Sequence, residues 1–527
     1  MGYSDIGCFG SEIKTPNIDR LAFNGLRFTQ FYNTARSSPT RASLLTGLYP
    51  HQAGMGHLAN QNFPEPGYND DLSPNAVTIA EVLGKEGFST YMAGKWHVSK
   101  DIEMDGNKSN WPCQRGFQRF FGTLNGSGSY YDPGTLVSMN KFIAPGKDFY
   151  YTDAISDTTV KFIMEHPDGK PFFIYVAYTA AHWPLHAPEN EVRKYKGKYD
   201  MGWDVIREQR FNRLKDLGII NDKCVLTQRG IDIPEWKDEP LKEWQTRRME
   251  VYAAMIDIMD QGIGRIITAL EEKGELDNTV IFYMHDNGGC AELQGADKQT
   301  VPLTDEQKIL KPLSVDSIFW GKRPEYSRDG RYVRSGKGVM AGDADTWMAY
   351  GEEWANVSNT PFRLYKHWTH EGGIASPLIV HWPKGIAAKG ELRKQPSHLI
   401  DIMATCLDIG GIKYPEQFNE NPILPPEGKS LVPAFKNKDL NRDLIFWEHE
   451  GNRAIRVDNW KLVSRTEKAK QFTSKDQNAW ELYDLEEDPS EIIDMATKYP
   501  EKVKELSELW KNEALRTKAL PWPWDKN

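Results

Sequence analysis

Residues Pro171–Tyr178 read Pro-Phe-Phe-Ile-Tyr-Val-Ala-Tyr, an almost unbroken apolar run. A run of this length and composition predicts a strand that is covered on both faces, as in a parallel sheet between two layers of helices. Further strands are predicted at Leu26–Tyr32, Phe88–Ala93, Thr279–Met284 and Pro377–Trp382. Because helical segments alternate with these strands, we expect an α/β fold with a large mixed, mostly parallel sheet flanked by helices.

The helices predicted around this sheet have clear boundaries. Thr15 and Pro16 suit the N-cap and the first helical position, and Gly25 ends that helix. A short helix is expected at Val77–Leu83. The strongest signal is Val251–Leu270, where apolar residues recur with a 3.6-residue period.

The chain is expected to divide into two parts. Residues 1–430 are expected to form the main domain, with a long irregular insertion at about 291–360 that is rich in Gly, Lys and Asp. Residues 431–527 form a small α+β C-terminal subdomain with a small antiparallel sheet. Its predicted elements are strands at Leu444–His449, Ala454–Val457 and Trp460–Ser464 and a helix at about Pro500–Leu515.

Composition excludes several classes of protein. The 65 basic and 74 acidic residues give a net charge of −9, which argues against nucleic acid as a partner. No apolar stretch reaches the ~18 residues of a membrane span. The opening MGYSDIGCFG lacks the basic segment and the apolar segment that a signal peptide contains. The five cysteines are scattered singly, so neither a disulfide framework nor a zinc cluster is expected. One disulfide remains an open alternative.

The segment Ser37–Gly47, SSPTRASLLTG, carries the strongest functional signal. Ser38 and Pro39 suit the N-cap and first position of a short helix. Ser37 would then stand just before a helix N-terminus, where free N–H groups and the dipole favour an anion. Arg41, one turn along, can reach back to the same point. The alternative interpretation from these residues alone is an ordinary capped helix.

Ser-x-Pro-x-Arg followed by Leu-Thr-Gly resembles the signature of the formylglycine-dependent (type I) sulfatases, of the arylsulfatase kind, in the alkaline phosphatase superfamily. The resemblance implies that Ser37 is oxidised to formylglycine (3-oxoalanine), whose hydrate is the nucleophile. Serine rather than cysteine at this position implies an anaerobic radical maturase as a partner. An engineered Ser in place of Cys, which would be inactive, stays open.

Four more segments match the family in order. They are Gly94–His97, Ala181–Pro188, Asp286–Gly289 and the stretch around Lys366. The resemblance implies the catalytic residues Ser37, Arg41, Lys95, His97, His182 and Lys366. It implies the metal ligands Asp286, Asn287 and modified Ser37, with Ca²⁺ as the metal and Mg²⁺ as the alternative.

The chemistry of these residues agrees with that assignment. Each of these motifs is expected just after a strand or near a helix start, and open α/β sheets bind ligands at the carboxyl ends of their strands. Asp286 and Asn287 are hard oxygen donors suited to Ca²⁺ or Mg²⁺. The lysines, Arg41 and two histidines could neutralise a dianionic tetrahedral group. Taken singly, such residues are more often structural. Four nearby histidines are left open as structural or pocket-lining: His186, His285, His367 and His370.

The N-terminus departs from the family pattern. Gly2–Cys8 matches the segment that normally follows a strand ending in two aspartates, but the strand and both aspartates are not in this chain. We expect a gap in the sheet and a metal site two carboxylates short, with Asp5 considered as a substitute ligand. A start at an internal Met or a truncation would explain this, and the full-length protein would then be periplasmic or secreted.

These observations predict a sulfatase that hydrolyses aryl or carbohydrate sulfate esters, so that a small molecule or a glycan sulfate is the substrate. One alternative is a phosphoryl hydrolase of the same superfamily. The other is a degenerate, non-catalytic binding protein, if the chain truly starts at Met1.

Overall fold

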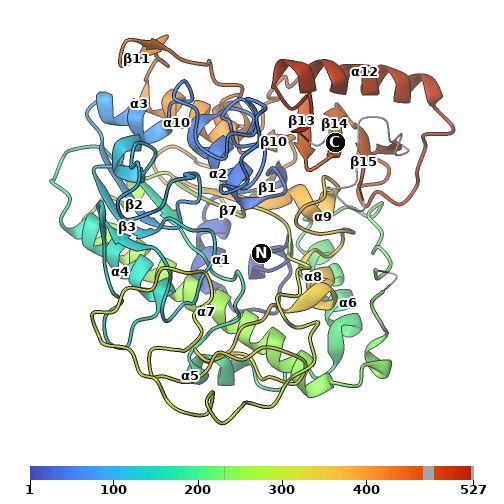
Figure 1. The fold of residues 1–527 in the computed structure, drawn as a ribbon. Helices are drawn as coiled ribbons and strands as arrows, with labels where there is room; N and C mark the ends of the chain where they lie inside the picture. Colours follow the sequence, from blue (N-terminus) through green and yellow to red (C-terminus); the bar gives the residue numbers. More distant parts are fainter. Residues whose placement is uncertain (231, 467–479, 524–527) are drawn as a thin grey trace.

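The structure is a computed structural model that describes residues 1–230, 232–466 and 480–523. Within these ranges the strands form two five-stranded sheets, one four-stranded sheet and a two-stranded ribbon. Helices flank the sheets, which confirms the mixed α/β class (Figure 1). The sequence predicted one large sheet, whereas the strands are divided between two, because strand partners are chosen by packing that the local sequence does not contain.

The first sheet has the order β10-β1-β8-β7, with β9 also paired to β1. Its members are β1 (Leu26–Tyr32), β7 (Ile281–Met284), β8 (Ala375–His381), β9 (Glu391–Arg393) and β10 (Ser397–His398). β1 runs parallel to β9 and β10, but β8 runs antiparallel to both β1 and β7. The predicted parallel arrangement therefore holds only for part of this sheet.

The second sheet has the order β5-β4-β3-β2-β6. The strands are β2 (Ser89–Gly94), β3 (Arg119–Thr123), β4 (Leu136–Ser138), β5 (Lys141–Phe142) and β6 (Phe172–Ala177). β6, β2 and β3 are parallel, and β4 and β5 continue the sheet as antiparallel strands. The carboxyl ends of β2 and β6 therefore lie side by side, with Gly94 opposite Ala177.

Helices cover both faces of the second sheet. Successive side chains of β2 point to opposite faces: Tyr91 contacts Phe162 of α4 (Tyr151–Met164), while Met92 shares a core with α3 (Ile79–Lys85). Helix α3 begins with a capping box formed by Thr78 and Glu81. Helix α7 (Lys242–Glu272) packs along α4 and is longer at both ends than the predicted Val251–Leu270.

β6 forms one edge of the second sheet, β7 forms one edge of the first, and these two edge strands lie near one another. Phe172 and Ile174 of β6 and Ile281 of β7 pack against the same small core of Ile163 and Leu270. Every residue of β7 and most of β6 are only half-buried, although both strands are apolar. The two sheets therefore approach each other at strands that are only partly covered.

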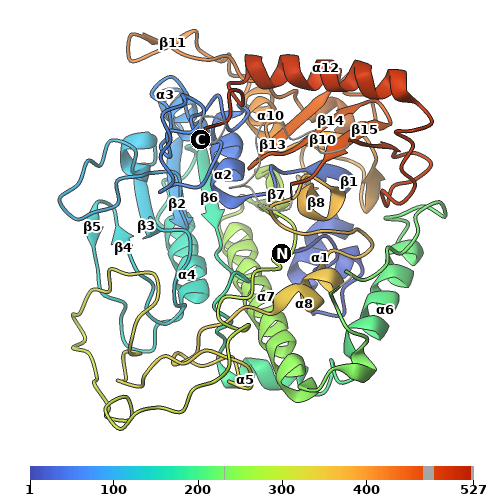
Figure 2. The same ribbon diagram turned by 45° about the vertical axis from the view of Figure 1, so that its right-hand side comes forward.

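The C-terminal part contains an antiparallel meander of β13 (Ile445–His449), β14 (Asn452–Val457), β15 (Trp460–Ser464) and β16 (Glu481–Asp484). Helix α12 (Pro500–Arg516) lies along the outside of these strands (Figure 2). The three predicted strands and the terminal helix are therefore present, and β16 is an addition.

The expected irregular insertion at 291–360 lacks named strands and helices up to Tyr350 within the described residues, but α8 (Gly351–Ser358) lies inside the predicted range. The remaining elements are α1 (Pro16–Phe23), α5 (Glu189–Val192), α6 (Gly202–Asp216), α9 (Glu371–Ile374), α10 (Asp401–Gly410), α11 (Val432–Phe435), β11 (Gln417–Phe418) and β12 (Asn421–Pro422).

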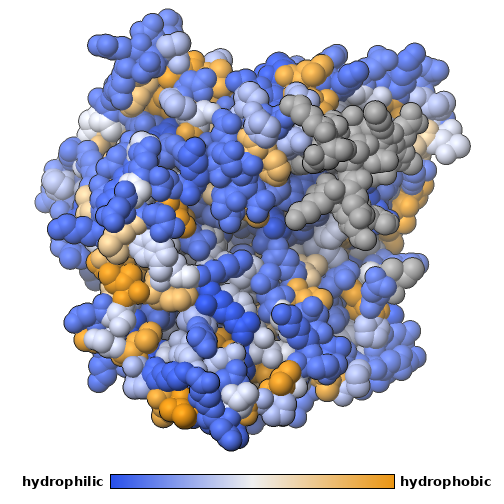
Figure 3. Space-filling model, viewed as in Figure 1, coloured by the Kyte–Doolittle hydropathy of each residue, from blue (hydrophilic) through white to orange (hydrophobic). Residues whose placement is uncertain are grey.

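The face of the molecule shown in Figure 3 is mainly hydrophilic, and its apolar residues occur in small separate groups. Among the described residues, no helix has both the length and the apolar character that crossing a membrane requires.

Candidate active site

Ser37 is the first residue of helix α2 (Ser37–Thr46). The sequence predicted Ser38 as the N-cap, and this is wrong: Arg36 is the flanking residue, with an extended backbone, and Ser38 lies inside the helix. The hydroxyl of Ser38 instead accepts the backbone N–H of Ala59. Gly47, in a left-handed conformation with φ of 67°, ends the helix as predicted.

The side chain of Ser37 is surrounded by charged groups. Lys95 Nζ donates to Ser37 Oγ at 2.7 Å, and Arg41 Nε donates to it at 3.1 Å. The hydroxyl itself donates to Asp286 Oδ2 at 2.8 Å. One buried oxygen at a helix N-terminus thus contacts two cations and one carboxylate.

The fold explains why these residues meet. Lys95 directly follows β2, Asp286 follows β7 by two residues, and Arg41 lies one turn along α2. Their strands end at the same side of the molecule, where α/β sheets bind ligands. This grouping of Ser37, Arg41, Lys95 and Asp286 was predicted from the sequence.

Arg41 ties this group together. Its guanidinium donates to Asp286 Oδ2 at 3.1 Å, to the backbone oxygen of Lys95 at 2.9 Å and to Tyr175 Oη at 3.1 Å. Burial alone would raise the pKa of Asp286, but Arg41 and Lys95 lower it well below its usual range. Burial and the neighbouring Arg41 lower the pKa of the Lys95 ammonium.

His182 and Lys366 form a second group. Lys366 Nζ lies 3.3 Å from His182 Nε2, and His182 Nδ1 lies 2.8 Å from the backbone oxygen of Trp183. Because a carbonyl can only accept, Nδ1 carries the proton and Nε2 accepts from Lys366. Burial and the positive charge of Lys366 lower the pKa of His182 well below its usual value, so the imidazole is neutral.

Glu292 joins these groups and was missed at the sequence level. Its Oε1 lies 2.9 Å from Arg36 and 3.7 Å from Lys366, and its Oε2 accepts from Trp183 Nε1 at 2.7 Å. Arg36 precedes Ser37 and Trp183 follows His182. No local motif marks Glu292, which lies in the irregular insertion.

His97 lies beside this centre rather than on Ser37. Its pKa is lowered well below the usual value by burial and by the charges of Lys95 and Arg41. Gly126 packs against the ring so closely that a Cβ there would come within 2.3 Å of it. The Nδ1 atom of His97 is buried and lacks a hydrogen-bond partner among the described residues.

The predicted metal ligands fit a hard cation in kind but not in number. Asp286, Asn287 and an oxygen of residue 37 supply oxygen donors, and the amide nitrogen of Asn287 donates to Gly288 O, which leaves the amide oxygen for an ion. Ca²⁺ prefers ~6–8 oxygens. Asp5 is no substitute, because its carboxylate is taken by Arg210 at 2.7 Å, the Tyr252 hydroxyl at 2.7 Å and Gly2 N at 2.6 Å.

Three of the four histidines whose roles the sequence left undecided make structural contacts. His186 Nε2 bonds the backbone oxygen of Thr346, His285 Nε2 bonds the Tyr283 hydroxyl, and His370 Nε2 lies 3.3 Å from Glu481. His367 belongs to another cluster, described below. All five cysteines are free, so the disulfide that the sequence left open is not formed.

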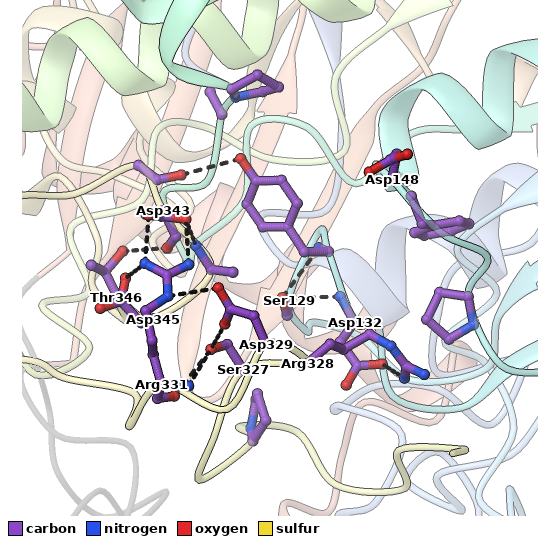
Figure 4. A pocket seen from close by; sticks show the side chains of 18 of the residues that line it. Ser129, Asp132, Asp148, Ser327, Arg328, Asp329, Arg331, Asp343, Asp345 and Thr346 are labelled. Carbon is purple, nitrogen blue, oxygen red and sulfur yellow. Dashed lines mark hydrogen bonds and ion pairs between the residues drawn. The ribbon is translucent and has the colours of Figure 1, made fainter. Parts of the chain in front are cut away.

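Two cavities lie in this half of the molecule. A small one of about 50 Å³ is lined by Arg41, Lys95, His182, Asp286 and Asn287, and also by Met1. A larger cavity of about 910 Å³ lies between the insertion and the loop that contains Ser129. In this cavity Arg328 pairs with Asp132 (Figure 4). Arg331 pairs with Asp329, Asp343 and Asp345.

The amino-acid sequence matches the models of known protein families. The family model described as Sulfatase matches residues 1–412, most of the chain. The chain belongs to the sulfatase family. A second model, described as N-sulphoglucosamine sulphohydrolase, C-terminal, matches residues 362–518 of this sulfatase.

Curated relatives agree with this assignment. This sulfatase is 31% identical to an uncharacterized sulfatase of Schizosaccharomyces pombe, over 97% of this chain and 91% of that protein. It is 32% identical to the arylsulfatase of Klebsiella aerogenes, over 82% of this chain and 89% of that protein. The protein is therefore a sulfuric ester hydrolase of the alkaline phosphatase superfamily with arylsulfatase-like homologues.

Solved structures share the fold. The crystal structure of Ps i-CgsB covers all of this chain and 91% of its own, with 23% identity and a TM-score of 0.63. A protein in complex with its substrate D-glucosamine-2-N,6-O-disulfate covers all of this chain and 98% of its own, with 21% identity and a TM-score of 0.60.

Proposed function

We propose that this sulfatase hydrolyses sulfate esters through a formylglycine derived from Ser37. The observation that carries this is the Ser37 oxygen, held by Lys95 at 2.7 Å, Arg41 at 3.1 Å and Asp286 at 2.8 Å at the start of a helix. A maturase would oxidise the Cβ alcohol to an aldehyde by removing two hydrogens, with both electrons passing to the maturase. Hydration of that aldehyde supplies one oxygen to attack sulfur and a second to help release sulfate.

The charges around residue 37 suit a sulfate group. Lys95 and Arg41 hold the attacking oxygen, and the N-terminal N–H groups of α2 favour the anion. Asp286 accepts the proton of that oxygen in the present geometry. These groups are positioned before the reaction, so they stabilise developing charge without reorganisation.

The leaving oxygen is assigned to His182 and Lys366. The neutral imidazole presents Nε2 toward Lys366 Nζ at 3.3 Å and orients the ammonium, which can give a proton to a departing alkoxide or phenoxide and become a neutral amine. His97 is proposed to take part in release of sulfate, because it is a buried base whose pKa is affected by the charges of Lys95 and Arg41.

Asp286 and Asn287 are proposed to hold a divalent cation, Ca²⁺ or Mg²⁺. When bound, such an ion would add positive charge beside the sulfate oxygens. The ligands present here are too few to hold it tightly.

A carbohydrate sulfate is the proposed substrate class. The N-acetylglucosamine-6-O-sulfatase of Bacteroides thetaiotaomicron is 26% identical over 96% of this chain, and one of the structural neighbours holds a sulfated glucosamine. Aryl sulfates would then serve as convenient reporters, in keeping with the Klebsiella relative.

The test is side-by-side turnover of an aryl sulfate and the matching aryl phosphate by protein produced together with an anaerobic maturase. We expect sulfate hydrolysis to exceed phosphate hydrolysis and to vanish in Ser37→Ala. Faster phosphate turnover, or sulfate turnover that survives in Ser37→Ala, would contradict the proposal.

A further inference from the structure

A second cluster of potential ligands surrounds the β13–β14 hairpin. Its two-residue turn is Glu450-Gly451, and both residues have positive φ, 50° and 80°. Such turns favour Asn, Asp or Gly at both positions. Glutamate at the first position is therefore unusual, and it places a carboxylate at the tip of the hairpin.

Three imidazoles approach this carboxylate from different parts of the chain. His57 Nε2 lies 2.7 Å from Glu450 Oε1, His367 Nδ1 lies 3.0 Å from Oε2, and His449 Nε2 lies 3.6 Å from Oε1. The ligating atoms of His367, His449 and Glu450 all lie within 4.8 Å of one another.

His449 is the least satisfied member of this cluster. Its side chain is fully buried, yet neither ring nitrogen has a hydrogen-bond partner among the described residues. Because a buried polar group left unpaired is unfavourable, a ligand for these nitrogens would stabilise the arrangement.

We propose that His367, His449 and Glu450 bind a transition-metal ion of the zinc type. Two histidines and one carboxylate, with a position left for water, form a known zinc donor set. Nitrogen ligands distinguish this site from the all-oxygen group at Asp286. Bond lengths of ~2.0–2.2 Å require the ligands to move together by roughly an ångström on binding.

The neighbours of the cluster have defined roles in this proposal. His57 Nδ1 accepts the N–H of Leu58 at 2.8 Å, so Nε2 carries the proton and donates to Glu450. His57 therefore orients the carboxylate rather than binding the ion. Asn452 Nδ2 lies 3.3 Å from His367 Nε2, the nitrogen that must carry a proton once Nδ1 binds metal. Metal binding would therefore replace this contact, because the Asn452 side-chain oxygen is already used to accept the backbone N–H of Thr466 at 3.0 Å.

The ion would connect two parts of the molecule, the segment after Lys366 and the C-terminal hairpin. His367 directly follows Lys366 and donates its N–H to Ala35 O at 2.9 Å, two residues before Ser37. His449 and Glu450 belong to the C-terminal hairpin. The side chains of His367 and Glu450 are 20% and 12% exposed, which leaves a route from solvent. The proposal does not depend on the mechanism at Ser37.

The test uses chelator-stripped full-length protein in buffer with excess Ca²⁺, so that hard-oxygen sites are occupied. Zn²⁺ is added and the bound metal per chain is measured after dialysis. Co²⁺ is used in parallel, because nitrogen-ligated tetrahedral Co²⁺ absorbs visible light. We expect one Zn²⁺ per chain, and affinity at least ~10-fold weaker in His449→Asn and in Glu450→Gln.

Matched variants make the result specific. His381→Asn removes another buried imidazole with an unpartnered Nδ1, at the far end of β8, and should leave Zn²⁺ binding unchanged. Asp286→Asn should also keep the Co²⁺ absorption, which separates this site from the proposed sulfatase centre. Melting curves check that each variant folds. No bound Zn²⁺ in the wild type, or equal binding in folded Glu450→Gln, would overturn the proposal.

Discussion

At the residue scale, the tautomer of His182 decides what the second group can do. Its Nδ1–H is held by the Trp183 carbonyl at 2.8 Å, so only Nε2 faces Lys366 and the cavity. A carbonyl contact of this kind sets which nitrogen exchanges protons. His182 and Lys366 therefore act as one unit beside the leaving oxygen, whereas Lys95 and Arg41 act on residue 37.

Removing either member of this unit should affect poor leaving groups most. We predict that Lys366→Ala and His182→Ala lower kcat by ~10²-fold or more for aryl sulfates with poor leaving phenols, and less for good ones. The measurement is the dependence of log kcat on the pKa of the leaving phenol. Lys308→Ala, at an exposed lysine of the insertion, is the control. An equal loss across the series would reassign both residues to substrate binding.

Glu292 is predicted to be a positioning residue. It contacts Arg36, Trp183 and Lys366, which lie next to or within the two catalytic groups. We expect Glu292→Ala to lower kcat by ~10-fold or more with little change in KM, since a small misplacement of catalytic groups is costly. Glu292→Gln, which keeps an acceptor for Trp183, should lose less. A pure rise in KM would show instead that Glu292 binds substrate.

At the element scale, much of the arrangement was readable from the sequence. Apolar runs such as Phe172–Ala177 marked the strands, and the motif residues after β2 and β7 met as expected. Glu292 and the cluster around Glu450 could not be predicted, because no local motif marks them and their contacts join distant segments, as in the pairs Arg36–Glu292 and His57–Glu450. The antiparallel direction of β8 was also hidden, since a buried strand looks the same in either direction.

The half-exposed edges of β6 and β7 lead to a prediction about the metal site. A strand-forming segment ending in Asp-Asp, attached ahead of Met1, should pair there, because Met1 lines the cavity between Tyr178–Trp183 and Asp286. It would add two carboxylates to Asp286 and Asn287. We predict tighter Ca²⁺ binding, a higher Tm that rises further with calcium, and greater sulfatase activity.

The control for that experiment is the same segment ending in Asn-Asn, which should raise Tm without the calcium dependence. Thermal melts and rates are measured across a calcium titration for the two extended forms and the 527-residue chain. If the 527-residue chain already binds Ca²⁺ tightly and works at full rate, the conclusion that its metal site has too few ligands is wrong.

At the scale of the whole molecule, buried charges join the C-terminal meander to the catalytic part. Lys461 of β15 is fully buried and lies 2.7 Å from both Glu371, at the start of α9, and Glu491. Removing one partner of a buried ion pair leaves uncompensated charge, which typically costs about 3–5 kcal/mol. The two parts should therefore unfold together rather than separately.

We predict that Lys461→Met lowers the free energy of unfolding by an amount in that range. Denaturant titration followed by near-UV circular dichroism measures it. Lys511→Met, at an exposed lysine of α12, should change stability by less than ~0.5 kcal/mol. A Lys461→Met protein as stable as the wild type would show that the pair is dispensable for joining the two parts.

Peptide mass spectrometry decides whether residue 37 works as formylglycine. The protein is produced with and without an anaerobic radical maturase, and the mass of the Ser37 peptide and the sulfatase rate are measured for both. We predict a peptide ~2 Da lighter, from loss of two hydrogens, and activity that rises in proportion to the modified fraction. Full activity with an unmodified Ser37 peptide would contradict it.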